Sequence, residues 1–452
     1  MPERPVVMVG FVPVAVTSLA QFQPEGSVVV VDEPDVIRKR ELGPKADEAP
    51  VVRELIAWEY QLDGAADAFY NAHPDLDPVA IAPLQEYATP FAARLAERYG
   101  LPTGGYGALR ILRDKAVLRR VSRAAGILNP ESVEVTGPDE VRAFMAEHPG
   151  PAVLKPANRQ AALGTRILAS PDEIDDAWAE TTAMDEGVMV PDRGFELRML
   201  VERCVQGREY SVELLVERGR VVFGNVTGKE LYPGGRPVEL GHLVPADIPG
   251  ELDALLRAET GRLLAAVGFG TGIAHCEWIV EDGRPYLVEC AGRFPGDGIV
   301  DLMDRAYRVD LVRAFWTLMK GESLTAPLPE KAPGAAAIRF LHTGAGVVED
   351  VSGLDEARAL PGVQACSVTV EPGAEVRELR SSWDRVGSVV TEAETGAEAV
   401  AAARRALDTI QIKVRPAQDG SAADRPAQDG SAQDRPAQDR PAQDRPAQDR
   451  SA

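Results

Sequence analysis

The stretch 275-HCEWIVEDGRPYLVECAGR-293 places two carboxylates, Glu277 and Glu289, on either side of an Asp-Gly-Arg sequence. The flanking segments are rich in β-branched and aromatic residues, which favours strands, and the sequence between them is typical of a turn. The pattern therefore predicts a β-hairpin. The guanidinium of Arg293 follows the second acid by four residues.

The length of the hairpin loop decides whether the two acids meet. A three-residue loop over 282–284 brings Glu277 opposite Glu289, whereas a two-residue loop sends the acids to opposite faces, because side chains alternate along a strand. We expect the three-residue loop. Carboxylates about 5 Å apart repel unless a cation lies between them or one is protonated. Such an all-oxygen pair suits Mg²⁺, and the alternative is a solvated hairpin with salt-bridged glutamates.

The composition predicts a large globular protein. A chain of 452 residues with 45% hydrophobic content can form two or three domains. Its apolar runs fall short of the ~18 residues that cross a bilayer, and residues 1–5 lack a signal-peptide pattern, so we expect a cytoplasmic protein without a membrane partner. The net charge of −21 argues against a nucleic-acid partner. The four cysteines lack CxxC spacing, which predicts buried, reduced thiols.

The C-terminal segment 416–452 repeats Arg-Pro-Ala-Gln-Asp with little variation. It contains no large apolar residue, so it cannot offset the entropy of ordering and is predicted to be disordered. The alternative is a docking tail.

The opening segment predicts an α/β domain over residues 1–100. Two short apolar runs, 5–10 and 27–32, are separated by a stretch of helical length, which indicates a β-α-β unit of a parallel sheet. An amphipathic helix is expected over 89–99. Gly10 alone is a weak phosphate-loop signal and the GxGxxG pattern is missing, so no NAD site is predicted.

Two lysines follow this domain in positions that favour phosphate binding. Lys115 lies at the head of a predicted helix over 116–125, and Lys155 ends an apolar strand over 151–156. A lysine that closes a strand is usually only its polar end. With the polar loop 158–165 after them, however, the two ammonium groups are typical of a site that faces phosphates.

The segment 200–226 predicts antiparallel strands with turns at 206–207 and 218–219. Glu209 and Glu213 share a face because they are separated by an even number of positions. The simplest explanation of alternating acids is a solvated sheet face.

Taken in order, these segments resemble the ATP-grasp carboxylate–amine ligases, and in particular the L-amino-acid ligases. The resemblance extends over residues 101–320 and rests on the segments 114–115, 155, 202–205, 207–213, 241–245, 275–277 and 289–293. It implies an α/β (α+β) ATP-grasp fold. The nucleotide-binding domain would cover 101–325 and a C-terminal subdomain 326–415.

The resemblance implies a set of ATP-binding residues. Lys115 and Lys155 would contact the phosphates and the adenine edge, the segment 202–205 would offer backbone hydrogen bonds to adenine, and Glu209 would bind the ribose. Gly164 is the one glycine left in the phosphate-covering loop, which departs from the usual glycine-rich pattern. The full set is Lys115, Lys155, Gly164, Glu202, Arg203, Cys204, Val205 and Glu209.

The resemblance also implies a metal site and catalytic residues. Glu277 and Glu289 would hold Mg²⁺, or Mn²⁺ in its place, and Arg293 would bind the acyl phosphate as it forms. A second departure from the family pattern is an alanine, Ala291, where an asparagine ligand is usual. Lys229 is either a further phosphate-binding lysine or a simple surface lysine.

Two histidines complete the candidate site. His275 lies on the predicted face of Glu277, and His242 lies on a loop between Gly241 and Leu243. Both are candidate substrate contacts, with packing in the core as the alternative. Neither has metal-ligand spacing with another histidine or cysteine.

The reaction implied is ATP-dependent amide formation between a small-molecule carboxylate and an amine, through an acyl phosphate. The resemblance allows a homodimer, and the composition hints at specialised metabolism such as antibiotic biosynthesis. Three alternatives stay open. They are a biotin-carboxylase-like enzyme, a non-catalytic ATP-binding regulator and a two-carboxylate hydrolase.

Overall fold

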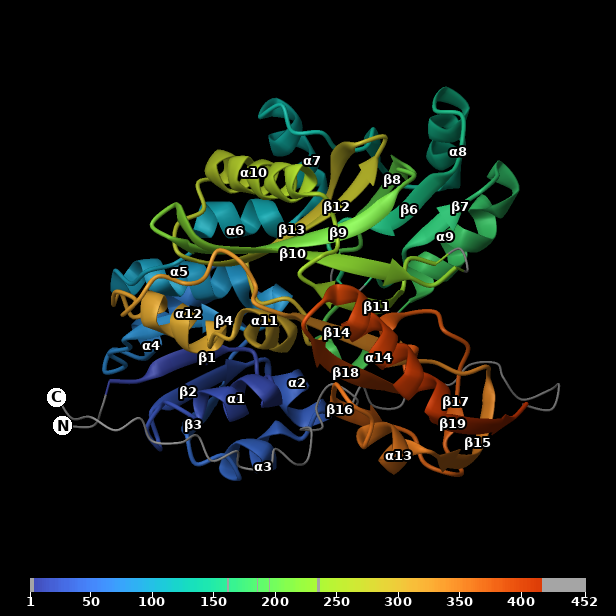
Figure 1. Ribbon diagram of the computed structural model, residues 1–452. Coiled ribbons are helices and arrows are strands. Elements are labelled where there is room, and N and C mark those ends of the chain that lie inside the picture. Colours follow the sequence, from blue (N-terminus) through green and yellow to red (C-terminus); the bar gives the residue numbers. More distant parts are fainter. Residues whose placement is uncertain (1–3, 161, 185, 195, 234–235, 417–452) are drawn as a thin grey trace.

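The computed structural model describes residues 4–160, 162–184, 186–194, 196–233 and 236–416 (Figure 1). The predicted repeat tail lies outside these residues apart from Pro416. Within them no helix is long and apolar enough to span a membrane. All four cysteines are buried and free, as predicted.

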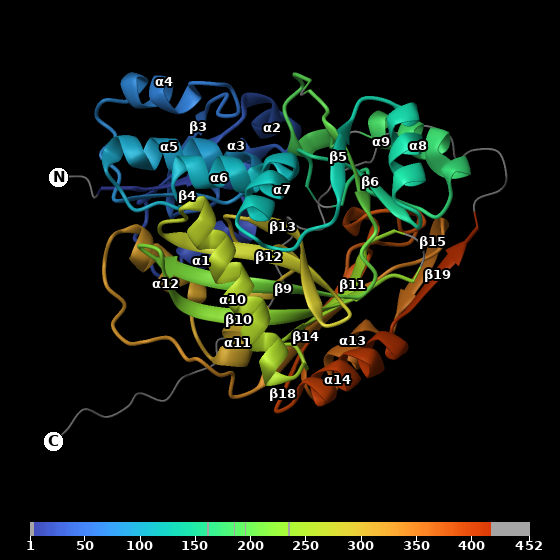
Figure 2. The same ribbon diagram turned by 90° about the horizontal axis from the view of Figure 1, so that it is seen from above.

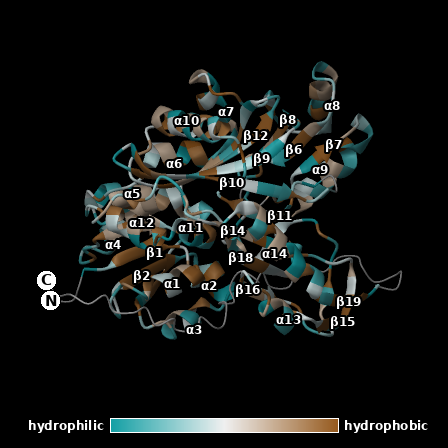
Figure 3. Ribbon diagram, in the orientation of Figure 1, coloured by the Kyte–Doolittle hydropathy of each residue, from teal (hydrophilic) through white to brown (hydrophobic). Residues whose placement is uncertain are grey.

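The first sheet is parallel, with strand order β3-β2-β1-β4. Its strands β1 and β2 are buried on both faces, which explains their continuous valine runs, and both are hydrophobic in Figure 3. The prediction of a β-α-β opening and of the helix over 89–99 is confirmed. The elements are β1 (Val6–Val9), β2 (Val28–Asp32), β3 (Val52–Ala57), β4 (Ala80–Pro83), α1 (Pro13–Leu19), α2 (Pro34–Lys39), α3 (Leu42–Asp47), α4 (Ala65–Ala72) and α5 (Thr89–Tyr99).

A second, smaller sheet has a hydrophobic cluster of its own. Its strand order is β5-β8-β6-β7, and its core joins residues from 135 to 201 with Phe144 and Ile174 of the covering helices. In Figure 2 this lobe lies at one end of the molecule. The elements are β5 (Ser132–Val135), β6 (Ala152–Pro156), β7 (Arg166–Leu168), β8 (Met199–Arg203), α8 (Pro138–Glu147) and α9 (Ile174–Ala183).

The largest sheet has eight strands in the order β13-β12-β9-β10-β11-β14-β18-β16. Its neighbouring strands pair antiparallel, and α10 packs on one face over β9 and β10. Its elements are β9 (Arg208–Glu217), β10 (Arg220–Leu231), β11 (Glu239–Val244), β12 (Gly272–Glu281), β13 (Arg284–Ala291), β14 (Ala335–Leu341), β16 (Val363–Val368), β18 (Gly387–Ala393), α6 (Tyr106–Arg113), α7 (Lys115–Ala124) and α10 (Gly250–Val267).

Helices and a small sheet complete the chain after β13. Helices α11 and α12 join the large sheet to the hydrophobic cluster of the N-terminal sheet. The C-terminal strands form a three-stranded sheet in the order β17-β15-β19. These elements are α11 (Ile299–Tyr307), α12 (Leu311–Met319), α13 (Leu354–Arg358), α14 (Gly396–Thr409), β15 (Gly346–Ser352), β17 (Glu375–Val376) and β19 (Gln411–Arg415). The domain boundaries given from the sequence stay predictions.

The turn expected at 206–207 is not a hairpin. Strand β8 pairs with β5 and β6, whereas β9 pairs with β10 and β12, so the segment between them passes from one sheet to another. The turn at 218–219 does connect an antiparallel pair, β9 and β10, as predicted.

The loop predicted for the β12–β13 hairpin is wrong. Glu281 pairs with Arg284, so the loop holds two residues, Asp282 and Gly283. Both have positive φ angles, 50° and 75°. An Asp-Gly pair is favoured in this type of two-residue turn because its backbone twist matches that of the strands.

A β-bulge nevertheless brings the two acids together. The register shifts between Glu277 and Trp278, since Trp278 pairs with Leu287 but Glu277 pairs with Glu289. Val288 is therefore the extra residue, which moves the second acid to the face of the first. The predicted opposition of Glu277 and Glu289 is confirmed, for a reason other than the one expected.

Candidate functional site

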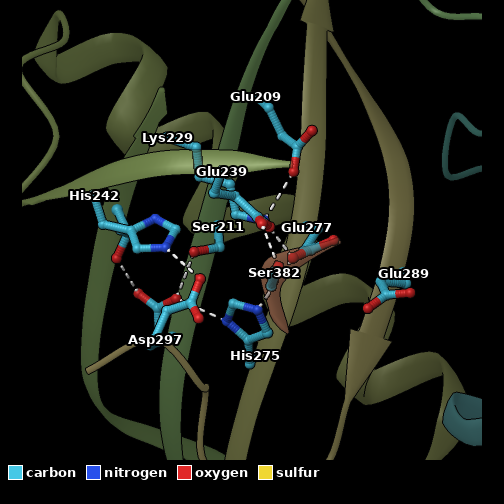
Figure 4. A network of polar contacts seen from close by, with 12 residues as sticks. Glu209, Ser211, Lys229, Glu239, His242, His275, Glu277, Glu289, Asp297 and Ser382 are labelled. Carbon is cyan, nitrogen blue, oxygen red and sulfur yellow. Dashed lines mark hydrogen bonds and ion pairs between the residues drawn. The ribbon is translucent and has the colours of Figure 1, made fainter. Parts of the chain in front are cut away.

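One face of the large sheet changes from apolar to polar along its strands. Leu215, Phe223 and Ile273 belong to the cluster that includes the N-terminal sheet. Further along the same face the residues are polar, and the register places them side by side (Figure 4). The polar set is Glu209, Ser211 and Glu213 from β9, Asn225, Thr227 and Lys229 from β10, and His275 and Glu277 from β12.

Glu213 is fully buried, so the expected solvated face is wrong at this position. Its carboxylate accepts hydrogen bonds from Ser211 at 2.7 Å, Thr227 at 2.7 Å and Asn225 at 2.8 Å. Burial alone raises the pKa of Glu213, but these bonds and the contact with His275 outweigh burial and lower it. The strand pattern carries no information on these cross-strand donors.

Lys229 lies among three carboxylates and is not a surface lysine. Its side chain is 1% exposed, and Nζ lies 2.8 Å from Glu209, 3.4 Å from Glu239 and in contact with Glu277. Burial lowers the pKa of Lys229, but the charges of Glu209 and Glu277 outweigh it and raise the pKa well above its ordinary value. Burial also raises the pKa of Glu209 to about 7, with the charge of Lys229 acting against it.

The carboxylates of this face offer oxygen donors to a divalent cation, and the ammonium of Lys229 lies among three of them. Oxygens of Glu209, Glu239 and Glu277 lie within 4.8 Å of one another. Glu289, opposite Glu277 in the register, contacts Lys115 at 2.8 Å. All-oxygen donors of this kind suit Mg²⁺. Glu277 belongs both to the cluster with Glu209 and Glu239 and to the pair with Glu289. Glu239 was not identified from the sequence.

His275 is held between two carboxylates. Its Nδ1 lies 2.9 Å from Glu213 and its Nε2 lies 3.4 Å from Glu277. Burial lowers the pKa of His275, but hydrogen bonds to the two acids outweigh it and raise the pKa to about 9. Both ring nitrogens are thus occupied by protein groups, and the imidazolium orients Glu277. A direct contact between His275 and substrate stays a prediction.

A buried ion cluster lies where the small lobe meets the rest of the site. Glu202 contacts Lys155 at 2.6 Å and accepts two hydrogen bonds from Arg119, at 2.7 and 3.1 Å. Burial raises the pKa of Glu202, but the charges of Arg119 and Lys155 outweigh it and lower the pKa to about 2. Burial lowers the pKa of Lys155. Arg119, on α7, was missed because a helical arginine usually faces solvent.

Two backbone N–H groups of the predicted adenine hinge already form hydrogen bonds within the protein. The backbone N–H of Arg203 donates to the carbonyl of Glu131 at 2.9 Å, and that of Cys204 donates to Pro151 at 3.0 Å. Cys204 and Val205 are both buried. Adenine would therefore have to use other backbone groups of the hinge.

The polar loop after β6 lies against Lys115. The ammonium of Lys115 donates to the backbone carbonyl of Arg159 at 2.9 Å, and Arg159 lies 3.6 Å from Glu186. Gly164 has a positive φ of 76°, and an added Cβ would lie 3.1 Å from Thr181. Glycine is therefore required for the bend of this loop rather than only for closeness to a phosphate.

Arg293 connects the hairpin to the N-terminal unit. Its Nε donates to Glu86 at 2.7 Å, and its Nη1 donates to the carbonyl of Phe294 at 2.7 Å. Glu86 lies in a short helix (Glu86–Ala88) after β4 and is buried. It was missed because no pattern in the sequence relates residues so far apart.

His242 belongs to a second charged network. Its Nε2 lies 2.9 Å from Asp297, which accepts from Arg385 at 2.8 Å. Arg385 also donates to Glu239 at 3.0 Å. Burial raises the pKa of Asp297, but the bonds to His242 and Arg385 outweigh it and hold the pKa well below its usual range. Asp297 and Arg385 were not identified from the sequence.

Comparison with known families accounts for this arrangement. Residues 148–301 match the model of the ATP-grasp domain, and residues 339–415 match that of the L-amino acid ligase C-terminal domain 2. The chain belongs to the ATP-grasp ligase family. The ATP-grasp match includes the polar face and, of the small lobe, β6, β7, β8 and α9, and the C-terminal match includes Arg385.

Individual proteins are similar to this chain in sequence or in fold. The chain is 28% identical over 346 residues to an uncharacterised protein of Sinorhizobium fredii, covering 76% of this chain and 70% of that one. It is 28% identical over 249 residues to the D-alanine–D-alanine ligase of Geobacter sulfurreducens, covering 53% and 74%. The fold is similar to that of the L-amino acid ligase from Bacillus licheniformis, with a TM-score of 0.71, 18% identity, and coverage of 91% and 99%.

Proposed function

We propose that this ATP-grasp ligase joins the carboxylate of one amino-acid-like substrate to the amine of another through an acyl phosphate. The supporting observation is the single polar face on which the acids Glu277 and Glu289 are opposed and each is paired with a lysine. Arg293 follows on the same hairpin. Such a set fits a polyanionic substrate and a transferring phosphoryl group.

The three lysines in and beside the polar face each have a role in this proposal. Lys115 and Lys155 bind the phosphates of ATP, and their present partners Glu289 and Glu202 keep them oriented before ATP arrives. Glu277 and Glu289 would hold Mg²⁺, which supplies positive charge beside the phosphates. Lys229 keeps Glu209, Glu239 and Glu277 close together despite their mutual repulsion.

Arg293 is the proposed contact for the acyl phosphate. Its Nε is fixed by Glu86, which leaves part of the guanidinium fork for a phosphoryl oxygen. The reaction then has two steps. A carboxylate oxygen attacks the γ-phosphorus and ADP leaves, and the amine nitrogen next attacks the acyl carbon and phosphate leaves.

A substrate screen tests the proposal. The purified protein is incubated with ATP and Mg²⁺ and with the twenty L-amino acids, singly and in pairs, while phosphate release and product mass are measured. We expect phosphate release that depends on specific amino acids, with one amide formed for each ADP. Turnover that requires bicarbonate but no amine would indicate a carboxylase instead. ATP binding without turnover under every condition would indicate a regulator.

A further inference from the structure

We propose that His242 is the general base that removes a proton from the attacking amine, and that Asp297 and Arg385 position it. The inference rests on the proposed amide-forming function and assigns one step within it. It is suggested by a buried histidine nitrogen that has no hydrogen-bond partner among the described residues.

The contact with Asp297 determines which nitrogen of His242 is available. An ionised carboxylate only accepts hydrogen bonds, so Nε2, 2.9 Å from Asp297, carries the hydrogen of the neutral ring. Nδ1 then carries a lone pair. This atom is buried and has no hydrogen-bond partner among the described residues. A buried acceptor without a donor is costly, which favours a ligand that donates to it.

Arg385 fixes the carboxylate that orients the histidine. It holds the other oxygen of Asp297 at 2.8 Å and Glu239 at 3.0 Å, and its guanidinium lies 3.8 Å from the centre of the Phe340 ring. The side chain of Arg385 is 7% exposed. Asp297 therefore has both oxygens engaged, and its orientation is determined by two elements distant in sequence.

The histidine lies close to the groups proposed for the chemistry. Asp297 follows Arg293 by four residues, and His242 pairs with Lys229 in the register of β10 and β11. Figure 4 shows His242 and Asp297 beside Lys229 and Glu239. The ring of Phe340 lies edge-on to the imidazole, at 5.9 Å between ring centres. His242 therefore lies on the polar face beside Lys229, and its partner Asp297 belongs to the segment that follows Arg293.

Two protons leave the attacking nitrogen during amide formation, and each has an acceptor. An amino-acid amine is an ammonium at neutral pH and has no lone pair to donate, so one proton must leave first. That proton passes to Nδ1 of His242, and the nitrogen lone pair then forms the bond to the acyl carbon while the carbon–oxygen bond to phosphate breaks. The second nitrogen proton leaves with the phosphate. His242 returns its proton to solvent when the products depart.

Hydroxylamine separates this role from a general loss of function. Hydroxylamine is neutral at pH 7.5, so it attacks an acyl phosphate without a base and gives a hydroxamate, which is detected as its coloured ferric complex. The wild-type protein is first screened for hydroxamate with ATP and each of the twenty L-amino acids. The active acids are then paired with each L-amino acid as amine, and both rates are measured for the wild type and the variants.

We expect His242→Asn to lower the ratio of amide rate to hydroxamate rate by about 10²–10⁴-fold, the range of general-base catalysis. Asp297→Asn should lower the same ratio, because an amide can donate to Nε2 and so favour the tautomer with a protonated Nδ1. The matched control is His342→Asn, at an exposed histidine, which should leave the ratio unchanged.

A second measurement needs no substrate. In protein labelled with ¹⁵N-histidine, the resonances that His242→Asn removes should show a protonated Nε2 and an unprotonated Nδ1. A protonated Nδ1 in the wild type would overturn the proposal, as would equal losses of hydroxamate and amide in His242→Asn. If the wild type forms neither product with any acid, the proposed function itself fails.

Discussion

Replacing Glu202 by glutamine should destabilise the small lobe by several kcal/mol. Glu202 is 2% exposed and is the shared anion of Arg119 and Lys155, both buried. The glutamine keeps the shape but leaves two buried cations without a counter-charge. Removal of one partner from a buried ion pair costs about 3–5 kcal/mol.

The depressed pKa of Glu202 gives a second value for the contribution of this carboxylate to the free energy of unfolding. A carboxyl whose pKa falls from 4.5 to about 2 on folding contributes about 3 kcal/mol, since each pKa unit corresponds to about 1.4 kcal/mol. The folded-state pKa is depressed, so this contribution is present above about pH 4.5 and is lost as the pH falls towards 2. The difference in stability between wild type and Glu202→Gln should therefore shrink over that interval.

Hydrogen exchange of the amides of β6 and β8 measures this effect locally, because a chain with several lobes need not unfold in one transition. The control is Glu134→Gln, at an exposed acid whose side chain is 40% accessible and which pairs with Arg120 and Arg198. That substitution should cost about 0–1 kcal/mol. Equal effects of the two substitutions would refute the reasoning, as would a difference that stays constant down to pH 2.

Four further outcomes are expected. Glu277→Gln should abolish Mg²⁺-dependent ADP formation in a coupled assay while the circular dichroism spectrum is retained; near-normal turnover would remove this acid from the metal site. Arg293→Lys should keep ATP affinity by calorimetry but lose amide formation by on the order of a hundredfold, and equal losses would place the arginine in the nucleotide pocket. Gly207→Ala should lower the melting temperature, at a cost of about 1–3 kcal/mol, because its Cβ would lie 2.0 Å from the carbonyl oxygen of Val280. Deletion after Arg415 should change neither melting temperature nor turnover, and a fall in either would show that the repeat contributes.

The elements of the fold were largely predictable because periodicity and turn residues are local. The buried valine runs of β1 and β2 and the amphipathic α5 are examples. The environment of Lys229 was not predictable. A lysine on a strand usually faces water, and only the pairing of β9, β10 and β12 shows that three acids surround it.

The residues that contact the site from distant parts of the chain were also not predicted from the sequence. Asp297 and Arg385 are 88 residues apart, and the contact between them is formed by segments with no shared periodicity. Glu86 and Arg293 are 207 residues apart. A single sequence contains no signal for such pairs, so the residues that orient His242 and Arg293 could be found only from the structure.

The bulge at Val288 has a consequence for insertions and deletions in related chains. The residues between Glu277 and Glu289, 278–288, are odd in number. With this number a regular ladder on a two-residue loop would send the acids to opposite faces, and the bulge brings them opposite each other. Deleting Val288 would remove the bulge and move the second acid one position closer to the loop, where the regular ladder again places it opposite Glu277. Lengthening the loop to three residues while removing the bulge would leave the acids opposed. Among functional relatives with an odd number of residues between the two acids, an even loop should therefore occur with a bulge and an odd loop with a regular ladder.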